Sequence, residues 1–176
     1  FLDKREFAGP IYSQIENAVD FVLRNIRLGA IIDGLVRKET YELPPEAIRE
    51  MIVNAHCHRN LLDESCIQVA VYDDRLEITS PGGLYNGLTY EEVMNGHSKI
   101  RNRGIANIFS QMGLVEAWGS GIKRIFNAAK EYGLPEPRFQ EFDNMFRVEL
   151  FRNSLPMAQK NEDIGETSEK HRRSIK

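Results

Sequence analysis

The stretch that decides the fold runs from Pro44 to His58 and reads PPEAIREMIVNAHCH. Proline is tolerated in the first turn of a helix, because its missing N–H would have no partner there. Apolar residues then recur at the spacing of one helix face: Ile48, Met51, Ile52 and Ala55. Polar residues lie four apart, so they also share one side of that helix: Glu50, Asn54 and His58. The pattern predicts a helix with a buried stripe beside a polar file, and we expect a functional site to begin at that file.

Length and composition are those of an ordinary globular protein. The chain has 176 residues, 41% of them hydrophobic and 28% charged, which suits one domain with a core of its own. The net charge of −3 and the pI near 5.9 do not favour non-specific nucleic-acid binding by this chain. Since the chain does not open with Met, we expect it to be part of a longer protein.

The cysteine content and the lack of long apolar runs bear on the compartment. Two cysteines, Cys57 and Cys66, indicate a reducing environment without a disulfide framework. No apolar run is long enough to span a bilayer, and no signal-peptide pattern is present. We therefore expect a cytoplasmic protein with no membrane partner.

Periodicity and turn signals divide the rest of the chain into helices and hairpins. Before the central helix we expect a helix over about 11–28 and an extended hairpin over 30–41. After it, CIQVAVYDD and RLEITS predict a second hairpin over 66–80. Thr89 and Glu92 form a capping-box pattern for a short helix.

The C-terminal half continues with two helices and a strand. The first helix, over about 100–112, has four apolar residues predicted to face inward: Ile105, Ile108, Phe109 and Met112. The second follows a glycine loop at 119–121, and a strand is predicted over Met145–Phe151. Residues 153–176 have few apolar side chains and predict a disordered tail or linker after a domain over 1–152.

The order of these elements bounds the fold class. Two hairpins exclude an all-parallel sheet. We expect an α/β fold in which helices pack on one face of a mixed, mostly antiparallel sheet.

The polar file on the central helix could carry chemistry. The amide oxygen of Asn54 suits Mg²⁺, which prefers oxygen donors and keeps several waters. Glu50, one turn earlier, could orient or deprotonate a water that attacks a phosphate. The alternative is a solvated polar helix face, which spacing alone favours because polar pairs four apart are common.

Three loops offer groups that suit an anion. Gly119, Ser120 and Gly121 open a helix whose N–H groups attract phosphate, although such a turn is often only a turn. The GxxxxGK[ST] spacing of a Walker loop is absent. The others are Ser80-Pro81-Gly82-Gly83 and the run 96–102, which contains His97 and Ser98; plain turn chemistry and a helix N-cap at Ser98 are the alternatives.

Zinc binding is the other chemistry that this region raises. His56, Cys57, His58 and Cys66 lie close in sequence, but neither CxxC nor HExxH spacing is present. We therefore expect no zinc site here, and we expect His56 to be a packed or surface histidine.

Several segments together resemble one known family. They occur in this order: REMIVNAHCHRN, DDRLEITSPGGL, GLTYEEVMNGHSKIRN, GLVEAWGSGIKRI and FRVEL. Over about residues 5–152 the chain resembles the RecG-related, GHKL/HATPase-like C-terminal domain of AlbA- or Schlafen-type transcriptional regulators of bacteria and archaea. The resemblance implies a two-layer α/β sandwich of the Bergerat type, and no helicase motor motif is present despite the family's name. It also implies DNA binding through other domains of the full-length protein, and we expect a homo-oligomer.

The resemblance also implies roles for individual residues, with ATP and Mg as expected cofactors. Glu50 matches the family's water-handling, catalytic residue and Asn54 its metal ligand. The expected nucleotide or phosphate contacts are Gly82, Gly83, His97, Ser98, Gly119, Ser120 and Gly121. One departure stands out, because Ser80-Pro81-Gly82-Gly83 replaces a D-x-G-x-G box whose Asp recognises adenine. Loss of that acceptor reduces discrimination between bases.

Two functions follow, and the residues do not decide between them. One is an ATP/Mg-binding regulatory domain, for which hydrolysis stays open; Glu50, Asn54 and the glycine loop favour it. The other is a degenerate oligomerisation or interaction module of a DNA-binding regulator, which the missing Asp favours. DNA binding by this chain alone is a weaker third option.

Overall fold

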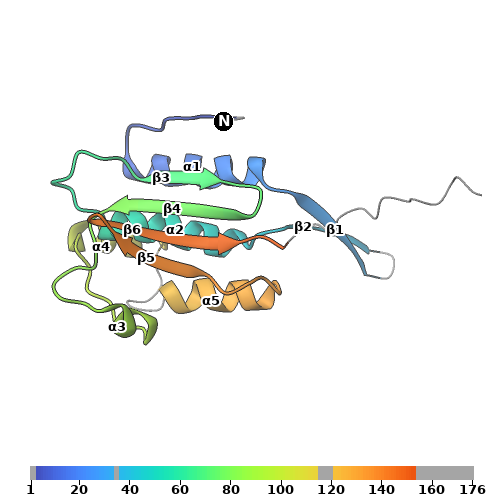
Figure 1. Cartoon of the computed structure of the whole chain (residues 1–176). Coiled ribbons are helices and arrows are strands. Elements are labelled where there is room, and N and C mark those ends of the chain that lie inside the picture. The colour runs from blue at the N-terminus through green and yellow to red at the C-terminus, as the bar shows by residue number, and fades with distance from the viewer. Residues whose placement is uncertain (1–2, 34–35, 115–120, 154–176) are drawn as a thin grey trace, which may run out of the picture.

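The computed structural model describes residues 3–33, 36–114 and 121–153. Four strands form an antiparallel sheet in the order β3-β4-β6-β5: β3 (Gln68–Val71), β4 (Arg75–Pro81), β5 (Arg138–Phe142) and β6 (Met145–Phe151). A separate antiparallel hairpin, β1 (Leu28–Asp33) and β2 (Val36–Tyr41), extends away from this sheet (Figure 1). The helices are α1 (Ile11–Asn25), α2 (Pro45–His58), α3 (Tyr90–Met94), α4 (Arg103–Gln111) and α5 (Gly121–Glu131).

The core forms where α2 packs on the two central strands. Leu76 and Ile78 of β4 pair in register with Leu150 and Val148 of β6, and all four side chains are buried. Buried apolar residues of α2, such as Ile48, belong to the same core cluster. Each fully buried Leu or Ile stabilises the fold by roughly 1.5–3 kcal/mol. Helix α2 therefore lies behind β4 and β6 in Figure 1, with α1 and α5 packed on its two sides.

On the opposite face of the sheet, charged side chains form ion pairs with one another, and no described helix packs there. Glu149 of β6 is only 2% exposed and accepts a hydrogen bond from Arg138 of β5. That bond lowers the pKa of the Glu149 carboxyl, and Arg75 lies 3.2 Å from its other oxygen. Charged residues alternate with apolar ones along β4 and β6, so the charged and the apolar side chains lie on opposite faces of the sheet. The predicted α/β fold with helices on one face is confirmed, and the sheet of the described residues is wholly antiparallel.

Most predicted local elements are present. Both hairpins form, and Thr89 and Glu92 make the reciprocal capping box at the start of α3. No helix in the described ranges is long and apolar enough to cross a membrane. The tail predicted over 153–176 lies, beyond Asn153, outside the described residues.

The structure differs from the expected local elements in four places. Helix α1 ends at Asn25, before the predicted Leu28, because Ile26 is already extended and the chain enters β1. Helix α4 begins after Asn102, so Ser98 is not its N-cap. Ile108 and Met112 are 57% and 50% exposed, since α4 turns only Ala106 and Phe109 fully into the core.

The fourth difference is strand β5, which was not predicted. It spans RFQEF, where Glu141 and Gln140 interrupt the apolar alternation and prolines precede the strand. Its pairing with β6 buries Phe139, which stacks on Phe126 of α5 at 5.6 Å between ring centroids. The edge strand is thus fixed by its neighbours, not by its own pattern.

Candidate functional site

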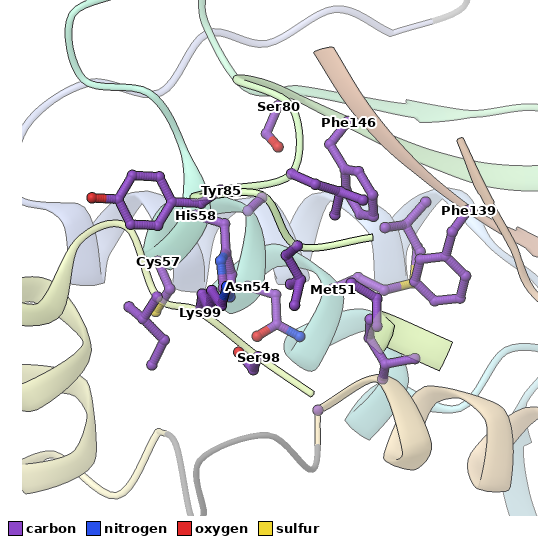
Figure 2. A pocket seen from close by; sticks show the side chains of 18 of the residues that line it. Met51, Asn54, Cys57, His58, Ser80, Tyr85, Ser98, Lys99, Phe139 and Phe146 are labelled. Carbon is purple, nitrogen blue, oxygen red and sulfur yellow. The ribbon is translucent and has the colours of Figure 1, made fainter. Parts of the chain in front are cut away.

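A cavity of about 110 Å³ lies between α2, α5 and the inner face of the sheet. Its apolar lining comes from helices and strands: Met51, Ile78, Ile125, Phe139, Phe146 and Val148. Its polar lining includes the whole predicted file of α2, namely Glu50, Asn54 and His58. In Figure 2, Phe139 and Phe146 lie on one side of the cavity, His58, Ser98 and Lys99 on the other, and Asn54 between them. The file is therefore not a solvated helix face.

Glu50, Asn54 and Gly121 meet at one corner of this cavity. The Asn54 Nδ2 donates to Glu50 Oε1 at 3.1 Å, and the Glu50 side chain is only 9% exposed. Gly121 begins α5, and a Cβ there would lie 2.3 Å from Glu50 Oε1 and 2.7 Å from Asn54 Nδ2. Any larger residue at the start of α5 would therefore push the ends of the Glu50 and Asn54 side chains out of their present positions. The structure brings together the predicted catalytic residue, the predicted metal ligand and one predicted phosphate contact.

Arg124 completes the corner from the first turn of α5. Its Nη1 donates to Glu50 Oε2 at 3.2 Å. A buried carboxylate costs free energy unless it is paired and hydrogen-bonded, and Arg124 and Asn54 both meet that need. The sequence showed Arg124 only as a cation in the first turn of a helix, where it opposes the helix dipole. Its role as the partner of Glu50 depends on a long-range contact that no local pattern signals.

The donors at this corner fit Mg²⁺ only together with a phosphate ligand. Within residues 3–33, 36–114 and 121–153, no three His, Cys, Asp or Glu side chains group to hold a metal. Mg²⁺ in nucleotide sites is held by one or two protein oxygens together with phosphate oxygens and water. The Asn54 Oδ1 supplies one such protein oxygen, while both oxygens of Glu50 already accept hydrogen bonds. A resident metal cage does not fit these residues, whereas a metal–phosphate ligand does.

His58 adds a neutral polar group to the cavity. Burial, with the nearby charge of Arg101, lowers the pKa of His58 to about 4. At neutral pH the imidazole is thus uncharged and has one donor and one acceptor nitrogen. Arg101 also fixes the backbone here, because its Nε donates to the His58 carbonyl and its Nη2 to the Gly83 carbonyl.

The neighbours of His58 on α2 are packed, not reactive. His56 is buried, as expected for a packed histidine, and burial with the charge of Arg59 lowers its pKa to about 4. Burial and then the charge of Glu50 raise the pKa of the Cys57 thiol to about 12. A thiol is nucleophilic only as the thiolate, so Cys57 is not a nucleophile at neutral pH.

The glycine loop after β4 shapes the cavity wall. Gly82 has φ +97°, and its N–H donates to the Asn144 carbonyl at 2.7 Å. The N–H groups of Gly83 and Leu84 donate to Asn144 Oδ1 and Glu141 Oε1, at 3.4 and 2.9 Å. These amides are therefore engaged within the chain in this arrangement. Gly82 and Gly83 both line the cavity, which is compatible with the predicted contact to a nucleotide. The contact itself stays a prediction.

The other predicted contacts lie around the same cavity where they are described. His97 and Ser98 line it from the loop between α3 and α4. Ser80, at the place expected for an adenine-reading Asp, lines it with a side chain that is 4% exposed. Gly119 and Ser120 lie outside the described residues. The sequence did not reveal that Phe139 and Phe146 line the cavity together, because Phe139 belongs to β5, the strand that was not predicted.

Comparison with known proteins adds a family to this geometry. Residues 64–150 match the family model described as "Putative ATP-dependent DNA helicase recG C-terminal". The chain contains a RecG-related, HATPase-like domain. The matched residues begin after α2, so Glu50 and Asn54 lie outside them.

A solved structure resembles the HATPase-like domain and includes more of the chain. The crystal structure of the DIP2311 protein from Corynebacterium diphtheriae is 26% identical and superposes with a TM-score of 0.73. The match covers 80% of this chain but only 29% of that chain, so this chain spans less than a third of that protein. No curated protein sequence matches this chain.

Proposed function

We propose that the HATPase-like domain binds a nucleoside triphosphate, ATP being the expected one, together with Mg²⁺. The observation that carries the proposal is the corner formed by Glu50, Asn54 and Gly121 at the edge of an apolar cavity. An apolar pocket with a few convergent polar groups is the usual form of a small-molecule site. The match to a HATPase-like family supports ATP as the ligand of this cavity, because the part of the lining from Ile78 to Val148 lies within the matched residues.

The cavity divides into parts that suit different parts of a nucleotide. Phe139, Phe146 and Met51 offer an apolar wall of the kind on which a flat base can pack. A cavity of about 150 Å³ with such a lining holds a benzene ring, so a volume of about 110 Å³ suits partial insertion of a base. The phosphates would then lie toward Asn54 and the first turn of α5, where backbone N–H groups favour anions.

Each polar residue at the corner has a task toward such a ligand. Asn54 would hold Mg²⁺ through its amide oxygen, with phosphate oxygens and waters as the other ligands. Bound Mg²⁺ would neutralise phosphate charge there. Glu50 is the candidate to orient a water, but both of its oxygens already accept hydrogen bonds, from Asn54 and Arg124. Binding is therefore the proposal, and turnover is a separate measurement.

We place this domain in a transcriptional regulator of the cytoplasm that binds DNA through other domains and forms a homo-oligomer. The support for such a regulator is the resemblance of the sequence segments described above. The net charge of −3 does not favour DNA binding by this chain itself, and two cysteines suit a reducing compartment. A second candidate, an interaction module that has lost its nucleotide, is favoured by one observation. Glu50 is the sole carboxylate among the described residues that line the cavity, so an adenine amino group has no carboxylate acceptor beside Ser80.

Thermal melting with and without MgATP tests the proposal. A ligand that binds only the folded state at about 100 times its Kd adds about 2.7 kcal/mol to the free energy of unfolding. We expect that gain in the native chain and its loss in Asn54→Ala. Asn127→Ala is the matched control, because Asn127 is exposed on α5. An unchanged melting temperature at millimolar MgATP, with no effect of Asn54→Ala, favours the interaction module instead.

A further inference from the structure

We propose that Arg124 exchanges partners, from Glu50 in the empty site to a phosphate group when a ligand binds. The ion pair then holds the Glu50 carboxylate until phosphate arrives, and phosphate binding releases it. This inference rests on the proposed function, since it concerns the same cavity. It adds an anion-binding residue and a form of regulation to that site.

The geometry of the pair allows such an exchange. Arg124 Nη1 donates to Glu50 Oε2 at 3.2 Å. Charge-assisted hydrogen bonds are usually about 2.7–2.9 Å long, and paired forks are the stronger arrangement. The contact between Arg124 and Glu50 is therefore longer than usual for a charge-assisted bond. The Arg124 side chain is also 34% exposed whereas that of Glu50 is 9% exposed, so the arginine is the partner that a ligand can reach.

The position of Arg124 matches the place proposed for the phosphates. It lies in the first turn of α5, three residues after Gly121, which faces Asn54 and Glu50. Its neighbour Lys123 passes close to Gly96, where a Cβ would lie 2.7 Å from Lys123 Cε. Gly96 directly precedes His97 and Ser98, which line the cavity. Two cations of α5 thus lie beside the corner and beside the loop that borders the same cavity.

Charge decides which partner Arg124 prefers. A carboxylate offers one negative charge, whereas a triphosphate chain offers several charges and can accept two parallel N–H···O bonds from one guanidinium. Phosphate therefore competes with Glu50 for Arg124. When Arg124 turns to phosphate, the Glu50 oxygen that accepted its N–H can accept a hydrogen bond from a water instead. The exchange would therefore couple phosphate binding to the placement of a water beside Glu50.

A double-mutant cycle tests the exchange. Binding of MgATP and of inorganic triphosphate is measured by calorimetry on the native chain, Glu50→Gln, Arg124→Gln and the double variant. We expect Arg124→Gln to weaken binding about tenfold and Glu50→Gln to tighten it about tenfold, each equal to about 1.4 kcal/mol. In the Arg124→Gln background, Glu50→Gln should change the affinity less than about threefold.

Matched controls are available on the same helices. Glu46→Gln removes an exposed carboxylate one turn before Glu50, and Lys130→Gln removes an exposed cation near the end of α5. Both should leave triphosphate binding unchanged. A readout that needs no variant at Glu50 is the nitrogen NMR signal of the Arg124 guanidinium, which should shift when triphosphate is added to the native chain.

The outcomes separate this inference from the proposed function. If the native chain binds MgATP and Arg124→Gln binds it equally well, the exchange is overturned and the proposed function stands. If Glu50→Gln raises the affinity equally with and without Arg124, the exchange is also overturned. That result would show only that removing the Glu50 charge relieves its repulsion of the phosphate. If MgATP does not bind but triphosphate binds Glu50→Gln through Arg124, the exchange stands and the nucleotide assignment falls. Binding of neither probe by any variant overturns both.

Discussion

Gly121→Ala is the substitution that tests the geometry of the site most directly. The added Cβ would lie 2.3 Å from Glu50 Oε1, so that oxygen must move by roughly 1 Å to reach an ordinary contact near 3.5 Å. The same Cβ would lie 2.7 Å from Asn54 Nδ2, so the Glu50–Asn54 hydrogen bond cannot stay as it is. We expect the two side chains to separate and the corner to lose its shape.

The magnitude follows from the bond that is lost. A hydrogen bond to a charged group contributes about 1.5–3 kcal/mol, which corresponds to roughly ten- to hundredfold in affinity if the ligand needs this arrangement. At a concentration of about 100 times the native Kd, the gain from MgATP should fall from about 2.7 kcal/mol to about 0.4–1.4 kcal/mol. The free energy of unfolding without ligand should change less, because alanine favours a helix over glycine by at most about 1 kcal/mol and offsets part of the clash.

Melting temperature and calorimetry with MgATP provide the measurement, and Gly104→Ala is the matched control. Gly104 lies in the first turn of α4, and a Cβ there meets no atom within 4 Å. Gly104→Ala should therefore gain up to about 1 kcal/mol of stability and keep the native ligand response. If Gly121→Ala keeps the native affinity and the native stability, α5 does not begin against Glu50 and Asn54, and the reasoning is refuted.

Three further predictions concern the fold. Ile48→Ala, at a fully buried site, should lower the free energy of unfolding in urea by about 2–5 kcal/mol. Leu62→Ala, at a site 94% exposed, should change that free energy by less than about 0.5 kcal/mol, and equal effects of the two substitutions would contradict the described core. Glu149→Ala should lower the free energy of unfolding by about 2 kcal/mol. This is less than breaking a buried pair usually costs, because Arg75 and Arg138 can turn toward water; an unchanged free energy would refute the ion pairs of Glu149 with these arginines. Acid should also destabilise the fold, because His56 and His58 have a pKa of about 4 when folded against 6.5 for the free side chain. The unfolded chain binds more protons between these values, so stability is complete above pH 6.5 and falls toward pH 4 by about 3 kcal/mol for each histidine. Urea unfolding at a series of pH values measures this fall, and a flat profile would contradict it.

Much of the fold could be predicted because it depends on local spacing. The polar file of α2 follows from residues four apart on a helix, whatever the rest of the chain does. The hairpin of β3 and β4 follows from β-rich runs around Asp73-Asp74, and the capping box at Thr89 joins groups only three residues apart. Each of these features involves neighbours in sequence, so the pattern of residue types is sufficient.

Other features of the fold depend on packing that no local pattern contains. Ile108 and Met112 have helical spacing suited to a core, yet α4 packs by Ala106 and Phe109 and leaves them exposed. Strand β5 forms because β6 supplies its hydrogen-bond partners, although its own sequence alternates poorly. Local propensity is a weak guide wherever tertiary contacts set burial.

The sequence by itself determined the ingredients of the site: Glu50 and Asn54 in file on one helix, and glycines at the start of another. The tertiary structure alone decided what these groups face. Packing of α5 against α2 puts Gly121 beside both side chains and lets Arg124 donate a hydrogen bond to Glu50. In the same way, the Asn144 carbonyl accepts a hydrogen bond from the Gly82 N–H. The physical reason is that backbone periodicity fixes the direction of a side chain relative to its own helix, whereas contacts between distant segments depend on how whole elements pack.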